Sequence, residues 1–190
     1  MKQRKQLEFK GFKRTKDVFG GSLLKGNPKT KRPLDSKLPT LLTLRGIQSG
    51  MRNPKTYGKV DHIVYKTAEK YGIRIYQYAN VGNHLHILIK VSKLKLWPAF
   101  IRELTGRIGS LLKTTLNLAK KFWKYRPHTR IVRGWQKAYK TAKLYVHMNF
   151  LEAEGHINRT ETKTLRDLRA IFTDSEDPKS YISASAAALA

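Results

Sequence analysis

The apolar positions of the chain switch between a period of two and a helical period, and their order predicts a succession of strands and helices. The run at 38–45 (LPTLLTLR) is apolar and rich in threonine, which is typical of a strand. From 54 to 71 the apolar residues recur at helical spacing, and Gly72 stands where such a helix would end. The stretch 73–79 (IRIYQYA) alternates again, so we expect a second strand there.

The second half of the chain continues this succession. The run at 84–91 (HLHILIKV) is rich in β-formers and follows a tight turn at 80–83 (NVGN), so it predicts a hairpin with the strand before it. One apolar face at three-four spacing predicts a long helix over about 96–121. A short strand is expected at 129–133, and a last helix over 134–153.

The first six of these elements form a βαββαβ pattern, which predicts an α+β fold. We expect a ferredoxin-like antiparallel sheet with helices on one face, plus a C-terminal helix. Ordered structure should begin at Leu38, which divides the chain into a basic arm (1–36), one domain (37–155) and a tail (156–190). The arm interleaves Lys and Arg with Phe, so it either lies on a phosphate backbone or is a solvated tail with a short hydrophobic clip.

Composition narrows the function. The 190 residues include 39 Lys and Arg against 13 Asp and Glu, a net charge of +26. A domain this basic repels itself unless a polyanion neutralises it, so nucleic acid is the expected partner. Scarce acids argue against a carboxylate-only metal site, and the absence of cysteine excludes thiolate zinc sites and disulfides. With no apolar run of membrane length and no visible secretory signal, we expect a cytoplasmic protein without a membrane partner.

The sequence Asn83-His84-Leu85-His86 on a predicted strand is the sharpest chemical feature. Side chains alternate along a strand, so His84 and His86 share a side, with Cα atoms about 6.5–7 Å apart. Two such imidazoles can converge on one ion. With no cysteine and few acids nearby, an ion that accepts mixed nitrogen and oxygen ligands fits, namely Mg²⁺ or Mn²⁺. The alternative is two histidines on a solvated strand face.

The last predicted helix carries Tyr145 and Asn149 one turn apart, hence on one face. If this helix lies beside the histidine strand, Asn149 would complete the ligands of the ion and Tyr145 would face a phosphate held by it. A phenol is a weak nucleophile because its pKa is about 10, and a metal-bound phosphate compensates. Tyr139 is the rival nucleophile, about 240° away round the helix. Alternatively, Tyr145 is an aromatic residue at the edge of the core.

Basic residues interleaved with aromatic ones, from position 120 onward, predict a DNA surface. Its candidate members are Lys120, Lys121, Lys124, Arg126, Arg130, Arg133 and Trp135. Phe122 and Trp123 lie within the same stretch as potential stacking faces, although Trp123 and Trp135 are equally compatible with burial.

A His-hydrophobe-His strand followed by Tyr-x-x-x-Asn on a late helix resembles the single-tyrosine HUH transposases. Over roughly residues 38–155 the chain is similar to the REP-associated tyrosine transposases and the small insertion-sequence transposases. The resemblance implies that His84, His86 and Asn149 bind a divalent ion. It also implies that Tyr145 attacks single-stranded DNA, giving a 5′-phosphotyrosine link and a free 3′ hydroxyl. Such an enzyme acts in DNA transposition and recombination.

The same resemblance implies single-stranded or hairpin DNA as partner, a homodimer or a monomer, and a nucleoid-associated location in a prokaryotic cytoplasm. Two positions depart from the family pattern: Gly82 stands where proline is frequent, and Phe150 follows Asn149 where proline is common. Two other functions fit the same charge. One is a non-catalytic nucleic-acid-binding protein, and the other is a domesticated transposase that binds DNA hairpins without mobilising DNA.

Overall fold

In the computed structural model of the chain, residues 17–24, 31–134 and 136–158 are described. The strands are β1 (Val18–Phe19), β2 (Thr40–Arg45), β3 (Ile73–Asn80), β4 (His84–Val91) and β5 (His128–Ile131). The helices are α1 (Tyr57–Lys70), α2 (Trp97–Thr115) and α3 (Lys137–Ala153), with short 3-10 turns η1 (Gly21–Leu24) and η2 (Leu94–Leu96).

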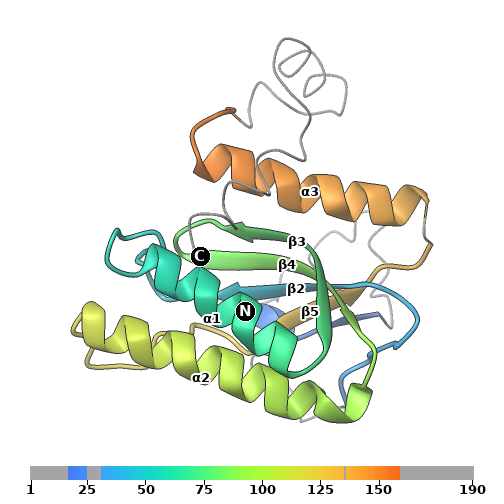
Figure 1. The fold of residues 1–190 in the computed structure, drawn as a ribbon, viewed down its shortest axis with the longest axis horizontal. Coiled ribbons are helices and arrows are strands. Elements are labelled where there is room, and N and C mark those ends of the chain that lie inside the picture. Colours follow the sequence, from blue (N-terminus) through green and yellow to red (C-terminus); the bar gives the residue numbers. More distant parts are fainter. Residues whose placement is uncertain (1–16, 25–30, 135, 159–190) are drawn as a thin grey trace, which may run out of the picture.

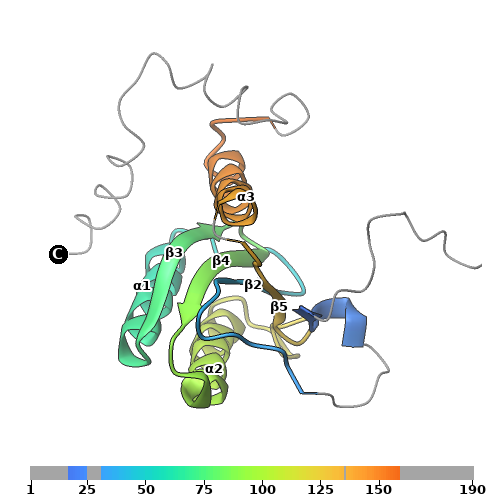
Figure 2. The same cartoon turned by 90° about the vertical axis from the view of Figure 1, so that its right-hand side faces the viewer.

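The five strands form one sheet in the order β1-β5-β2-β4-β3, and every neighbouring pair is antiparallel. Without the short β1, this is the strand order of a ferredoxin-like βαββαβ unit. Helices α1 and α2 cover one face of the sheet, and α3 lies on the other face (Figures 1 and 2). The predicted fold class is therefore confirmed.

Strand β4 separates the two faces by simple alternation. Leu85, Ile87 and Ile89 are fully or almost fully buried in the large core that α1 and α2 close. The intervening Leu88 belongs to a second, smaller cluster with Val146 of α3. Because side chains alternate along a strand, His84 and His86 lie on the α3 side with Leu88. Helix α3 packs on β3 and β4, so it brings its residues to the histidine-bearing half of the sheet.

Most boundaries lie within three residues of the predictions, and two differences are larger. Helix α2 ends at Thr115 rather than near 121, since Asn117 takes a left-handed backbone conformation (φ 48°) that no helix continues. Order does not begin at Leu38, because Val18 and Phe19 already pair with Arg130 and Thr129 of β5. Two residues are too few to produce a readable alternation, which is why this strand was not expected.

Side-chain contacts hold β1 on the sheet. The Asp17 carboxylate accepts two hydrogen bonds from the Arg133 guanidinium, at 2.6 and 2.7 Å. The Arg32 guanidinium lies 4.4 Å from the centre of the Phe19 ring. The rest of the predicted arm (1–16 and 25–30) and the tail from 159 onward lie outside the described residues. Within the part of the chain that the structure describes, no helix is both long and apolar enough to cross a membrane.

Candidate active site

The two histidines of β4 lie together at the edge of the surface that α3 covers. Their ring centres are 4.6 Å apart with planes at 88°. His86 is 4% exposed, whereas His84 is half-buried. In the sheet register, His86 lies opposite Thr43 of β2 and His84 opposite Arg45. The pair is thus held by the β2–β4 ladder rather than by a loop.

Each imidazole makes a hydrogen bond through Nδ1. Nδ1 of His86 lies 3.2 Å from Thr43 Oγ1, and Nδ1 of His84 contacts the side-chain oxygen of Asn83. An amide oxygen only accepts hydrogen bonds, so in this amide orientation Nδ1 of His84 is the donor, which in the neutral ring leaves the lone pair on Nε2. A neutral imidazole oriented in this way is the form that binds metal ions.

Helix α3 brings Tyr145 onto the histidines. The Tyr145 ring centre is 5.1 Å from that of His86, with planes at 81°. The Tyr145 side chain keeps 38% of its surface exposed, so a substrate can reach it. One turn later, the amide nitrogen of buried Asn149 donates to the backbone carbonyl of Tyr145 at 2.6 Å. Because that bond uses the nitrogen, the amide oxygen is the atom that a cation would take.

The rival tyrosine contacts a different strand. The ring of Tyr139 packs edge-to-face on Tyr76 of β3, with centres 5.5 Å apart. Burial, with a smaller contribution from Tyr76, raises the pKa of Tyr139, which makes its phenolate harder to form. Tyr145 is the tyrosine that contacts the histidine pair.

The turn before His84 explains one departure from the family pattern. Gly82 has φ +91°, and its carbonyl accepts hydrogen bonds from the backbone of Gly50 and Met51 at 3.0 and 2.9 Å. A Cβ at this position would lie 2.9 Å from Ser49 Oγ. Proline is locked near φ −65°, so it cannot adopt this conformation. Glycine here is a requirement of this particular turn, and the histidine strand begins directly after it.

The donor set fits a divalent ion of intermediate hardness. Among the described residues, no three His, Asp or Glu side chains gather in a metal-binding group. Ligands at this site would therefore be the two imidazole nitrogens together with a non-carboxylate oxygen, for which Asn149 has the right chemistry. Such a mixed nitrogen and oxygen set suits Mn²⁺, and with bound water also Mg²⁺.

The basic residues predicted to contact DNA are exposed wherever the structure describes them: Lys120, Lys121, Lys124, Arg126, Arg130 and Arg133. Trp135 lies outside the described residues. The guanidinium of Arg133 is engaged by Asp17, so this arginine also ties β1 to the segment after β5.

The interpretation of Phe122 as a stacking face is wrong, and for Trp123, which was equally compatible with burial, the structure favours the buried alternative. Phe122 is 1% exposed and belongs to the main core, where it lies directly beneath Gly46. Trp123 packs against the same core, and its indole nitrogen donates to the backbone carbonyl of Thr105 in α2 at 2.7 Å. Both rings hold the segment before β5 in place. Tyr125 is the aromatic of this stretch that reaches a surface pocket.

A family model described as "Transposase IS200 like" matches residues 49–149, just over half of the chain. The chain belongs to this family. The match spans both histidines and Tyr145 and ends on Asn149, so this IS200-like transposase carries all four candidate site residues inside the family region.

One solved structure shares the fold at a TM-score above 0.5. The transposase is similar to a REP-associated tyrosine transposase bound to a REP hairpin, at 15% identity and a TM-score of 0.51, over 68% of this chain and 76% of that one. A putative transposase from Deinococcus radiodurans R1 matches at 13% identity and a TM-score of 0.42, over 64% and 98%. Comparison with curated proteins gives no match.

Sequence reasoning missed the residues that orient the histidines of this transposase. Thr43 lies 41–43 positions before the pair in the chain and meets His86 only through strand register. Asn83 directly precedes His84 in the chain. A short polar residue next to a candidate ligand is the signal that could have identified it.

Proposed function

We propose that this transposase cleaves single-stranded DNA through a covalent tyrosine intermediate and rejoins the strand elsewhere. The observation that supports it most is the contact of Tyr145 with His86, on the helix turn that also carries Asn149. A protein that only binds nucleic acid has no use for an accessible phenol packed against paired imidazoles.

In the proposed step, the Tyr145 oxygen attacks the phosphorus of one phosphodiester. The new bond joins this oxygen to the 5′ phosphate, and the bond from phosphorus to the 3′ oxygen breaks. The phenol gives up its proton and the leaving 3′ oxygen takes one up, so the step is balanced. Attack of another 3′ hydroxyl on the phosphotyrosine reverses the step and gives strand transfer.

His84, His86 and Asn149 would hold the divalent ion, Mg²⁺ or Mn²⁺. When bound, such an ion stabilises the charge that builds on the phosphate oxygens. The side chains of Asn83 and Thr43 keep the imidazoles oriented, since each contacts one Nδ1. The packing of Tyr145 on His86 fixes the ring beside the site, which removes part of the entropic cost of the attack.

We further propose single-stranded or hairpin DNA of the prokaryotic nucleoid as the partner. A related fold is seen in a transposase bound to a REP hairpin. The exposed lysines and arginines around β5 would neutralise the phosphates. A homodimer and a monomer are both compatible with the proposed site.

Incubation with end-labelled hairpins carrying single-stranded flanks, with Mn²⁺ or Mg²⁺, tests the proposal. We expect a protein–DNA adduct that survives denaturation. Tyr145→Phe should abolish the adduct and the cleaved strand while DNA affinity is kept, because one oxygen is lost and the ring remains. Tyr139→Phe is the matched control and should retain both products. An adduct of undiminished yield with Tyr145→Phe would overturn the assignment, and binding without any adduct would favour the non-catalytic alternative.

A further inference from the structure

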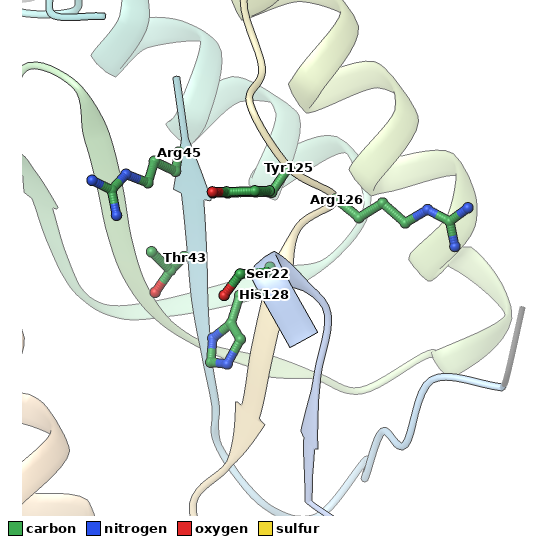
Figure 3. Close-up of a pocket in the computed structure, with 7 residues that line it drawn as sticks. Ser22, Thr43, Arg45, Tyr125, Arg126 and His128 are labelled. Carbon is green, nitrogen blue, oxygen red and sulfur yellow. The ribbon is translucent and has the colours of Figure 1, made fainter. Parts of the chain in front are cut away.

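A small open cavity of about 130 Å³ lies beside the histidine pair, on the part of the sheet formed by β2 and β5 (Figure 3). Its lining comes from η1, from β2 and from the segment that enters β5. The residues are Gly21, Ser22, Thr43, Arg45, Tyr125, Arg126 and His128.

The cavity adjoins the proposed active site through Thr43. This residue lines the cavity, and its hydroxyl contacts His86 at 3.2 Å. Thr43 lies opposite His86 on one side and opposite His128 on the other, so the three residues form one row across the sheet. Neighbouring strands are about 4.8 Å apart, which places the backbones of His86 and His128 roughly 10 Å from each other.

Backbone hydrogen bonds fix the walls. Gly21 N donates to the Arg126 carbonyl at 3.0 Å, and Lys124 N donates to the Arg45 carbonyl at 2.9 Å. Gly20 has φ +93° and approaches Pro127 so closely that a Cβ would lie 2.0 Å from its carbonyl oxygen. The backbone segments that carry the lining residues are therefore held close together.

The lining has the chemistry of a nucleotide site. Among the described residues, the lining includes two arginines and no acidic residue, together with the Tyr125 ring and the hydroxyl groups of Ser22 and Thr43. Burial, with help from the charges of Arg32 and Arg130, lowers the pKa of His128, which favours the neutral imidazole that both donates and accepts hydrogen bonds. In Figure 3 the Tyr125 ring reaches toward β2, Arg45 extends from β2 on the side away from this ring, and Arg126 points away in the opposite direction, so the two arginines flank the cavity.

The volume of the cavity limits which ligand it can hold. Pockets for whole drug-sized ligands measure about 300–1,000 Å³. At about 130 Å³ this open cavity takes one group, such as a single base, and leaves the remainder of the ligand outside. A polymer that lies across the sheet and inserts one base meets this requirement. Such a nucleotide would stack its base on the Tyr125 ring and place its phosphate near Arg45, so it would use both the aromatic and the cationic side of the lining.

We propose that this cavity holds one unpaired nucleotide of the DNA strand that Tyr145 cleaves. In a stacked strand, nucleotides advance about 3.4 Å each, so a separation of roughly 10 Å puts the held nucleotide within about three of the cleaved phosphate. The inference rests on the proposed function for the identity of that strand. The cavity then fixes where along the strand cleavage occurs.

Binding is tested in the Tyr145→Phe background, so that no cleavage interferes, with a fluorescein-labelled strand of twelve thymidines. Loss of one stacking face weakens binding about five- to 150-fold, so Tyr125→Ala should raise the Kd by that range and Tyr125→Phe should not. Tyr65→Ala is the matched control, because Tyr65 is 48% exposed on α1, across the sheet from the cavity. Equal affinities of the Tyr125→Ala and Tyr65→Ala proteins would overturn the proposal.

A second readout does not depend on a variant that must fold. One thymidine is replaced by 5-iododeoxyuridine, the complex is irradiated, and the cross-linked peptide is identified by mass spectrometry. We expect the peptide that contains Tyr125, and cross-links confined to α1 and α2 would refute the site. If binding depends on Tyr125 but the protein with Tyr145 intact forms no adduct, the proposed function fails while the cavity proposal stands. If Tyr125→Ala, with Tyr145 intact, forms the adduct in unchanged yield and binds the strand with unchanged affinity, the cavity proposal alone fails.

Discussion

Replacing Asp61 by asparagine should stabilise the fold near neutral pH and have little effect near pH 4. Asp61 lies on α1 and is 7% exposed, with its Oδ1 accepting a hydrogen bond from the Tyr78 hydroxyl at 2.7 Å. Burial raises the pKa of this carboxyl from 3.8 to about 6, and the hydrogen bonds from Tyr78 and Asn80 offset only part of that rise. Near neutral pH the protein therefore carries a buried charge that it tolerates at a cost.

The size of the effect follows from linkage. Between pH 4 and pH 6 the folded protein keeps a proton on Asp61 that the unfolded chain has released, so stability falls as pH rises through this window. At 1.36 kcal/mol per pH unit, the difference between 3.8 and about 6 corresponds to about 3 kcal/mol. Asparagine is neutral at every pH and keeps an oxygen that accepts from Tyr78. We expect Asp61→Asn to gain about 2–3 kcal/mol at pH 7.5 and close to none at pH 4.

Urea unfolding of both proteins at constant ionic strength, from pH 4 to pH 7.5, measures this difference. The control is Glu69→Gln on the same helix, where the carboxylate is 72% exposed and pairs with Lys66. Its effect should be within about 0.5 kcal/mol at each pH. A stability difference for Asp61→Asn that is the same at both ends of the range would refute the reasoning, as would a net loss at pH 7.5.

Three further outcomes can be measured. Gly46→Ala would place a Cβ 2.4 Å from buried Phe122, so we expect about 1–3 kcal/mol of destabilisation and a lower Tm; an unchanged Tm would contradict this. Arg52→Met removes the 2.9 Å ion pair with Glu154 and should cost about 1 kcal/mol above pH 5. That pair holds the pKa of Glu154 below its usual range, so the loss should shrink as pH falls below 4, and a loss independent of pH would argue against the pair. Single-strand affinity should fall about 50-fold between 50 and 200 mM salt if four phosphates are neutralised, and a flat salt profile would exclude phosphate contacts.

The βαββαβ succession was readable because each element has its own periodicity and because the connections after β2, α1 and β3 carry glycine. Strand β4 was predicted to the residue, since both of its ends are marked by a change of pattern. The strand β1 and the early end of α2 were not predictable. The first depends on pairing with β5 and the second on one left-handed residue, and neither leaves a repeating signal.

The candidate site was predictable as a set of groups but not as an arrangement. Helical spacing put Tyr145 and Asn149 on one face, yet only the packing of α3 on β3 and β4 shows that Tyr145, rather than Tyr139, meets a histidine. The cavity beside it joins η1, β2 and the segment before β5, which are far apart in the chain. The sequence left open whether Trp123 is buried or exposed, and its hydrogen bond to α2 decides the question.

The pairing of β1 with β5 has a consequence for how the molecule is made. Val18 leaves the ribosome long before Arg130, its partner, has been synthesised, so this contact has a large loop to close. The ladder between β2 and β4 can form earlier, whereas the β5 side of the sheet is completed last. A chain that began at β2 would keep the other four strands but leave β5 as an edge strand, whose unpaired backbone groups could pair with another copy. The two residues of β1 thus cover part of the β5 edge and reduce its tendency to aggregate edge to edge.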